Sequence, residues 1–247
     1  MSFFKKLLYA GQTNSELDHR VISHQWKNVK DVWNNINNQY DAIGIERILK
    51  LILILIQFIT PGLYIRALFG RKGKLSKHIG VEVYVIIKLI SAIFILKYQL
   101  FNFTICGYPV VLFWAVWMIF ETVFYTANLV FCNDVFETPH SYKRNIILIF
   151  VDYFQLTFDY ASIYLYFHVL KTTINGHDVI VTKSLDSAYF SFISSLTIGY
   201  GDIIPANDLG KRLVIGHIMI FLIFGVLFIN FYTSRIEEHK NKNRKTV

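Results

Sequence analysis

Long apolar stretches alternate with short polar segments along most of the chain. A helix needs about 20 mainly apolar residues to cross the roughly 30 Å hydrocarbon core of a bilayer. Five stretches meet this requirement, and they cover residues 48–69, 80–100, 109–131, 145–170 and 211–232. The pattern therefore predicts an all-α membrane protein with five spanning helices.

The connection between the fourth and fifth stretches differs from the others. It is forty residues long, residues 171–210, and its middle part is apolar. Non-helical backbone at membrane depth is tolerated where protein or a water-filled cavity surrounds it. We therefore expect a half-inserted segment here, with a short helix over residues 185–196.

The first stretch leaves the topology open because Pro61 and Gly62 interrupt it. Proline removes a helical hydrogen bond, so a broken, re-entrant segment with the N-terminus inside is one alternative. Five full crossings would instead put residues 1–47 outside and residues 233–247 in the cytoplasm. Cytoplasmic loops are rich in Lys and Arg, and residues 70–80 hold four basic residues and no acidic one. Since residues 1–47 are nearly neutral, loop charge favours an external N-terminus.

Residues 1–47 also contain a helical stripe of apolar positions. Its spacing alternates between four and three residues, which is typical of one face of a helix. The members are Ile22, Trp26, Val29, Trp33, Ile36, Tyr40 and Ile43. An amphipathic helix of this kind lies in a membrane interface, forms a seam between subunits or packs on its own subunit. We expect Gly44 to end it.

Composition agrees with a membrane protein. The chain is 54% hydrophobic and 17% charged, whereas soluble domains average about 25% charged residues. The net charge of +8 indicates basic cytoplasmic loops rather than a nucleic-acid partner. The basic tail, residues 233–247, suits anionic lipid headgroups or acts only as a topological anchor.

Residues 197–202 read Thr-Ile-Gly-Tyr-Gly-Asp. Consecutive backbone carbonyls face one side when ordinary and positive φ angles alternate, and glycine adopts positive φ at little steric cost. Gly199 and Gly201 stand at alternate positions. Such a segment can offer main-chain oxygens to a dehydrated cation without a fixed negative charge.

This motif resembles the selectivity filter of tetrameric potassium channels, and the resemblance extends over residues 185–232. It implies a pore domain, residues 144–232, with an outer helix (144–170), a pore helix (185–196), the filter (197–202) and an inner helix (211–232). Residues 48–131 would form a peripheral three-span bundle. Three identical partner subunits would complete a homotetramer in the plasma membrane. K⁺, held only by the filter residues Thr197, Ile198, Gly199, Tyr200 and Gly201, is the metal expected, with no cofactor.

The resemblance also implies residues that support the filter and the gate. Aromatic donors at the positions of Tyr189 and Phe190 would hold Asp202 and Tyr200. Phe190 has no donor atom, and this departure concerns the rigidity of the filter. Ile198 and Tyr200 would brace the loop against the pore helix. Gly225 would be a gate hinge or a close-packing position of the inner helix.

Charged residues inside the apolar stretches are the remaining candidates, because each is costly unless paired. They are Lys88, Glu121, Asp152 and Asp159. Lys88 and Glu121 fall at similar depth, so we expect an ion pair between them. The apolar stretches lack the repeated Arg or Lys of a voltage sensor, and the sequence shows no catalytic constellation.

The function that these sequence features lead us to expect is passive K⁺ conduction, not enzymatic catalysis. Two alternatives stay open. One is a membrane sensor or partner-binding protein with a channel-like core, working through the helix that carries Ile22 to Ile43. The other is a weakly selective cation channel, which the missing donor at Phe190 suggests.

Overall fold

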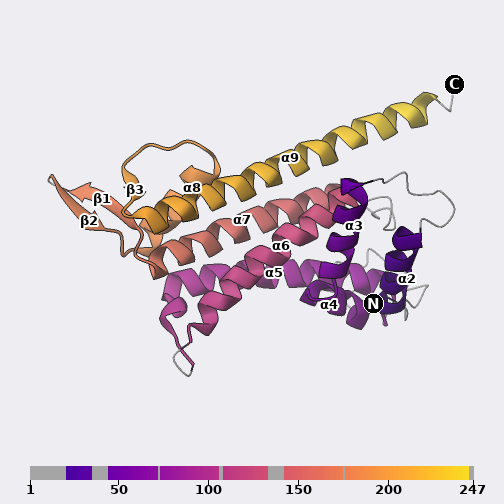
Figure 1. Cartoon of the computed structure of the whole chain (residues 1–247), viewed down its shortest axis with the longest axis horizontal. Coiled ribbons are helices and arrows are strands. Elements are labelled where there is room, and N and C mark those ends of the chain that lie inside the picture. The colour runs from indigo at the N-terminus through magenta and orange to yellow at the C-terminus, as the bar shows by residue number, and fades with distance from the viewer. Residues whose placement is uncertain are drawn as a thin grey trace, which may run out of the picture. The chain divides into compact units, whose positions relative to one another are not determined.

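A computed structural model describes residues 21–34, 44–71, 73–105, 108–132, 142–174 and 176–244. The elements in chain order are α2 (Val21–Asn34), α3 (Ile45–Ile56), α4 (Pro61–Gly70), α5 (Lys74–Tyr98), the short 3₁₀ helix η2 (Leu100–Asn102), α6 (Val110–Phe131), α7 (Tyr142–Tyr166), β1 (Leu170–Ile174), β2 (His177–Ile180), α8 (Ser184–Ser195), β3 (Ile203–Pro205) and α9 (Asp208–Arg244). The protein is mostly helical (Figure 1). The stripe positions Ile36, Tyr40 and Ile43 lie outside the described residues.

The chain divides into two compact units. An N-terminal unit comprises Met1–Ile87 and Ala127–His140, and a pore unit comprises Lys88–Thr126 and Ser141–Val247. The candidate filter and its neighbours all belong to the pore unit.

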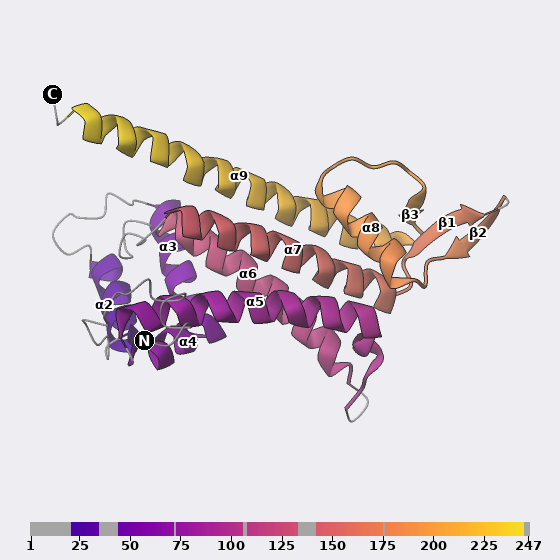
Figure 2. The ribbon, with the colours of Figure 1, turned by 180° about the vertical axis from the view of Figure 1, so that it is seen from behind.

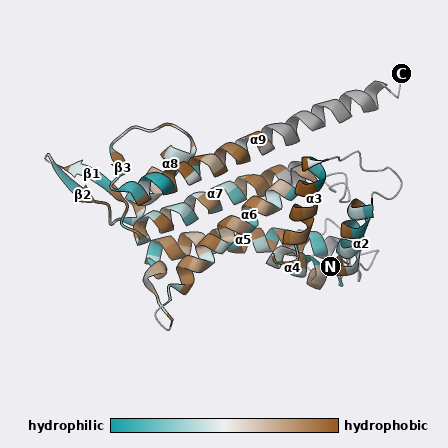
Figure 3. Ribbon diagram, in the orientation of Figure 1, coloured by the Kyte–Doolittle hydropathy of each residue, from teal (hydrophilic) through white to brown (hydrophobic). Residues whose placement is uncertain are grey.

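Four helices are long and apolar enough to cross a membrane. Their apolar parts are Ser76–Tyr98, Val110–Asn128, Ile146–Tyr166 and Asp208–Val226, and they match the four later stretches expected from the sequence. Figure 3 shows hydrophobic residues along α5 and α6 and hydrophilic residues on the hairpin of β1 and β2. This distribution fits helices surrounded by lipid and a hairpin in water.

The apolar stretch over residues 48–69 does not form one continuous helix. The chain forms α3 and α4 instead, joined by residues 57–60 and bent by 64°. Thr60 is extended because a residue before proline is disfavoured in the helical region, and Pro61 begins α4. The interruption read from Pro61 and Gly62 is therefore real.

The pore unit is built around α7. Helix α8 packs along α7, and α9 contacts both of them, as Figures 1 and 2 show from opposite sides. Leu156, Tyr164, Phe190 and Phe221 from these three helices share one buried core. The outer, pore and inner helices are thus one packed assembly within a single chain.

A three-stranded antiparallel sheet, absent from the all-α expectation, follows α7. Its strand order is β2-β1-β3, with Lys171 opposite Ile180 in one pair and opposite Ile204 in the other. The outer helix consequently ends at Tyr166 rather than at residue 170. His168, at φ 49°, turns the chain out of the helix into β1.

Candidate functional site

The backbone of residues 197–201 alternates in the sign of φ. Thr197, Gly199 and Gly201 have φ of 56°, 59° and 80°. Ile198 and Tyr200 do not have positive φ. This confirms the positive φ predicted at the two glycines, while the sequence did not indicate it at Thr197. An alternation of handedness lets successive peptide groups of one type face the same side of the chain.

Thr197 also ends the pore helix. The Thr197 N–H donates to Ser194 O at 3.1 Å, and the Ile198 N–H donates to Ile193 O at 2.9 Å. These two bonds form a Schellman motif, in which the left-handed residue is usually glycine. The filter therefore begins directly at the helix C-terminus, and α8 (Ser184–Ser195) agrees with the predicted pore helix to one residue.

Serine side chains hold the pore helix to the outer helix. Ser187 Oγ donates to Ala161 O at 2.8 Å, and Ser191 Oγ donates to Thr157 O at 2.7 Å. Ser195 Oγ lies 2.8 Å from the hydroxyl oxygen of Tyr153. The serines are spaced by four residues and so share one face of α8. Small side chains on this face let the two helices approach closely.

The sheet anchors the outer end of the filter. Thr172 Oγ1 on β1 donates to Asp202 O at 2.8 Å, and β3 begins at the next residue. Beyond β3, the Ala206 N–H donates to Val169 O at 2.7 Å. A Cβ at Gly210 would lie 2.7 Å from the same oxygen, so only glycine fits where α9 starts against β1.

Tyr189 and Phe190, the two filter supports that the resemblance implies, make different kinds of contact. The Tyr189 hydroxyl donates a hydrogen bond to the Asp202 carboxylate, and this bond raises the pKa of Tyr189. Phe190 is 5% exposed and packs edge-on against Tyr164, with ring centroids 5.3 Å apart. The position that lacks a donor is thus a core position of the pore unit.

Ile198 and Tyr200 are not covered by their own chain. Tyr200 is 69% exposed and Ile198 is 47% exposed. The expectation that they brace the loop against the pore helix stays a prediction.

The inner helix is continuous through the predicted hinge position. Helix α9 runs from Asp208 to Arg244, so it also includes most of the predicted tail, residues 233–247. A Cβ at Gly225 would meet no heavy atom within 4 Å. Gly225 does not pack closely within the described part of this chain, and its role as a hinge stays a prediction.

A histidine of α9 is buried beside the outer helix. His217 is 0% exposed, and its Nδ1 lies 2.9 Å from the Tyr164 hydroxyl oxygen. Its ring stacks on Tyr160, with centroids 4.1 Å apart, and meets Phe221 edge-on. These contacts hold α7 and α9 together beside the pore helix.

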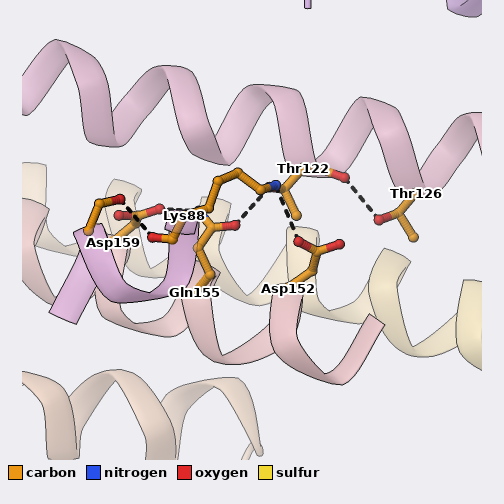
Figure 4. A network of polar contacts seen from close by, with 7 residues as sticks. Lys88, Thr122, Thr126, Asp152, Gln155 and Asp159 are labelled. Atoms are coloured by element: carbon orange, nitrogen blue, oxygen red, sulfur yellow. Dashed lines mark hydrogen bonds and ion pairs between the residues drawn. The ribbon is translucent and has the colours of Figure 1, made fainter. Parts of the chain in front are cut away.

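A buried polar network joins α5, α6 and α7 (Figure 4). Lys88 Nζ lies 3.2 Å from Asp152 Oδ1 and donates to Thr122 Oγ1 at 2.6 Å. Thr122 Oγ1 donates to Gln155 Oε1 at 2.8 Å, and Gln155 Nε2 donates to Asp159. Asp152 is thus one ion-pair partner of Lys88. Glu121 is also buried, at 2% exposed, and its pairing with Lys88 stays a prediction.

Sequence reasoning missed several residues that position the filter. Ser187, Ser191 and Ser195 recur every fourth residue, which is a readable signal on a short helix. Thr172 and Gly210 have no such signal, because their roles depend on strand pairing between distant segments. Among the described residues, no group of three His, Cys, Asp or Glu side chains could hold a metal ion.

Comparisons with known proteins bear on this region. The ion channel family model matches residues 146–238, which include most of α7, the sheet, α8, the candidate filter and most of α9. "Two pore potassium channel b" of Oryza sativa subsp. japonica is 33% identical over 58 residues, 24% of this chain and 16% of that protein. The similarity thus covers only a small part of this relative. No solved structure matches the chain.

Proposed function

We propose that the chain is a subunit of a potassium-selective channel of the potassium channel superfamily. The match of residues 146–238 to the ion channel family model and the similarity to a two-pore potassium channel support this proposal. The observation that carries this proposal is the alternation of φ over residues 197–201, in a segment held between the pore helix and β3. K⁺ is the permeant ion and moves passively down its electrochemical gradient.

Conduction follows from the chemistry of the filter backbone. A K⁺ ion that leaves water needs oxygen ligands to replace its hydration shell. The carbonyl groups of Thr197, Ile198, Gly199 and Tyr200, with the Thr197 hydroxyl at the inner end, supply one quarter of each ligand ring. The C-terminus of α8 carries roughly half a negative charge and favours a cation in the cavity below the filter. No catalytic step and no cofactor are part of the proposal.

The proposed assembly is a homotetramer. One chain cannot surround an ion, and the exposed Tyr200 and Ile198 support packing against neighbouring subunits. Helix α9 also carries an uncovered apolar stripe at positions i, i+4, i+7 and i+11. Its members, each at least 57% exposed, are Ile215, Met219, Leu222 and Val226. Part of this stripe would line the inner cavity and part would meet the next subunit.

The chain is an integral membrane protein, with four spanning helices and a bent pair. We propose the plasma membrane as its location and a cytoplasmic side for the basic residues 233–247. Anionic lipids and no nucleic acid are the partners expected besides the subunits. An external N-terminus requires the bent pair of α3 and α4 to cross the bilayer. Gating by an Arg-repeat voltage sensor is not part of the proposal.

Phe190 supports a second candidate, a weakly selective cation channel. It packs on Tyr164 and has no N–H or O–H group that could donate a hydrogen bond to Tyr200. A less rigid filter would discriminate K⁺ from Na⁺ less well. The ratio of K⁺ to Na⁺ permeability in planar bilayers decides between the two candidates.

Cation flux from proteoliposomes tests the proposed function. We expect the wild-type protein to release K⁺ and Gly199→Ala to abolish release, because Gly199 has φ +59° and a Cβ strains this conformation by roughly 1–2 kcal/mol. Gly216→Ala is the matched control, since a Cβ there meets nothing within 4 Å and its φ is not positive.

A wild-type protein that is folded and reconstituted but releases no K⁺ would overturn the proposal. It would favour the alternative of a sensor or partner-binding protein with a channel-like core. Equal flux from Gly199→Ala and wild type would exclude these filter carbonyls as the conducting ligands.

A further inference from the structure

The N-terminal unit presents an amphipathic helix in an unexpected orientation. The face of α2 that packs against the rest of the unit consists of Gln25, Asn28 and Val32, all buried. The apolar stripe is only partly covered, since Ile22, Trp26 and Trp33 are 41%, 52% and 66% exposed. Packing on its own subunit therefore leaves much of this stripe free over the described part of the helix.

Three different faces run along α2. Side chains one turn apart share a face, so the packed face and the apolar stripe are adjacent rows. A third row lies beyond the stripe, on the side away from the packed face, and contains Lys27, Lys30 and Asn34. All three are exposed. A helix with protein on one side, an apolar row next to it and a basic row beyond fits the boundary between acyl chains and headgroups.

Helix α3 lies antiparallel to α2. Arg47, near the start of α3, donates to the carbonyl oxygen of Trp33, near the end of α2. At the other end, Gln25 Nε2 donates to Ile54 O at 3.2 Å, and the rings of Trp26 and Phe58 have centroids 5.0 Å apart. The two helices are therefore held together at both ends, so their axes make the same angle with the plane of a membrane.

Helix α3 has an uncovered apolar stripe of its own. Its members are Ile45, Ile48, Ile52 and Leu55, which are 86%, 59%, 47% and 45% exposed. The other face carries a pair of charges, Lys50 with Glu46 at 2.8 Å. The antiparallel pair thus combines two apolar stripes with charged and amide groups.

The bent pair is poorly suited to crossing the bilayer. Only fifteen residues separate Lys50 from Arg66, and they contain the 64° bend. A spanning helix needs about 20 mainly apolar residues, and shorter stretches are typical of re-entrant or interfacial segments. Four crossings remain, and an even number places both termini on the same side.

We propose that α2 and α3 lie in the cytoplasmic interface of an anionic bilayer, and that the chain crosses the membrane four times. The stripes of Ile22, Trp26 and Trp33 and of α3 enter the acyl boundary. Lys27 and Lys30 meet anionic headgroups. The N-terminus is then cytoplasmic, which replaces the external location favoured by loop charge alone. This proposal does not depend on conduction.

Tryptophan fluorescence tests where α2 lies. The chain has four tryptophans, so Trp114→Phe with Trp117→Phe leaves only Trp26 and Trp33 as reporters. The protein is reconstituted into anionic vesicles whose lipids carry bromine either near the headgroup end or near the methyl end of the acyl chain. We expect the shallow bromines to quench about twofold more than the deep ones.

The matched control is Trp26→Phe with Trp33→Phe, which keeps Trp114 and Trp117 on the spanning helix α6. It shows that both bromine depths reach the protein. Absence of quenching of Trp26 and Trp33 by either lipid, or stronger quenching by the deep bromines, would overturn the interfacial position.

A second copy of the chain is the competing occupant of the stripe. In a background with Cys106→Ser and Cys132→Ala, Trp26→Cys would then form a disulfide between two copies under oxidation. We expect no more of this disulfide than a Lys97→Cys control gives. Dominant cross-linking at position 26 would overturn the proposal in favour of a subunit seam.

Cysteine labelling tests the number of crossings in the same background. We expect Ser2→Cys and Thr246→Cys to react with a membrane-impermeant maleimide only after permeabilisation, and Thr104→Cys to react in intact cells. Labelling of Ser2→Cys in intact cells would overturn the four-crossing topology. The quenching, cross-linking and labelling readouts are all independent of K⁺ flux, so failure of this proposal is distinguishable from failure of the proposed channel function.

Discussion

Thr197 adopts a backbone conformation that threonine rarely takes. Its φ of 56° lies in the left-handed region, where a Cβ costs roughly 1–2 kcal/mol. The cost is retained at a site where two hydrogen bonds close the end of α8. A glycine would satisfy the same motif without strain, so the side chain of Thr197 must have another use, and its hydroxyl is a K⁺ ligand in the proposed filter.

Stability and conduction should therefore change in opposite directions in Thr197→Gly. We expect this variant to be more stable than wild type by about 1 kcal/mol, because the left-handed strain is removed, and to conduct less, because the hydroxyl is lost. Thermal unfolding in lipid nanodiscs and K⁺ flux measure the two effects. Thr197→Ser, which keeps the hydroxyl, should conduct like wild type. A Thr197→Gly protein with full flux would exclude a role for the hydroxyl.

Replacing Lys88 should destabilise the protein, because its partner Asp152 would be left as an unpaired buried charge. Lys88 is 3% exposed and pairs with Asp152, which is 1% exposed. Removing one member of a buried pair leaves the other charge without compensation. We expect Lys88→Met to destabilise the pore unit by about 3 kcal/mol, measured by thermal unfolding.

The double variant Lys88→Met with Asp152→Asn is the control for this effect. It removes both charges, so it should recover much of the stability lost in Lys88→Met. Lys97→Met, at the end of α5 where the side chain is exposed, should change stability by less than about 0.5 kcal/mol. Unfolding of Lys88→Met at the wild-type temperature would contradict a structural role for the pair.

At the scale of elements, the position of the filter depends on how closely α8 packs on α7. Ser187, Ser191 and Ser195 keep the two helices close through bonds to main-chain carbonyls and to Tyr153. The other end of the filter is fixed by β3, which pairs with β1. The filter is thus fixed at both ends by elements of its own chain, while its middle is exposed.

Variants of Ser191 distinguish the two effects of this serine face, which are hydrogen bonding to α7 and close spacing of α7 and α8. Ser191→Ala loses one hydrogen bond to Thr157 O and should cost about 1 kcal/mol. Ser191→Val adds volume to a residue that is 0% exposed, so overpacking should cost about 1–3 kcal/mol and displace α8. We expect K⁺ flux to survive Ser191→Ala and to fall sharply in Ser191→Val. Equal flux in both variants would show that helix spacing does not control the filter.

At the scale of the whole molecule, the proposed pore requires several chains. Tyr200 is 69% exposed in one chain, and a ring of oxygen ligands cannot come from a single filter strand. Closed symmetry among identical subunits is the usual solution for soluble and membrane oligomers. Four subunits around one axis match the resemblance found in residues 185–232.

Mixing wild-type and Gly199→Ala subunits measures the number of chains in one pore. If a single variant subunit blocks conduction, equal co-expression leaves about one sixteenth of the current for four subunits and about one quarter for two. We expect the value for four. Gly216→Ala subunits, mixed in the same way, should leave the current unchanged. A residual current near one quarter would contradict the homotetramer.

Local sequence determined those parts of the protein whose chemistry is local. The length of the apolar stretches is sufficient to predict the four long apolar helices. In lipid the backbone N–H and C=O groups must be hydrogen-bonded within the segment, and a helix achieves this. Gly199 and Gly201 identify the positive φ positions, because only glycine adopts them without cost. Pro61 marks the break between α3 and α4 for a similar reason.

Tertiary structure decided the features that depend on distant partners. Strands β1 and β3 are short and acquire their conformation only by pairing across about thirty residues, so the sequence pattern did not reveal them. Whether Lys88 would meet Asp152 depended on how α5 and α7 pack, which equal depth in a membrane cannot specify. In α2 the sequence showed an apolar stripe, but the fold placed Gln25 and Asn28 against the protein and left the tryptophans outside. Periodicity defines the faces of a helix, and only packing decides which face is covered.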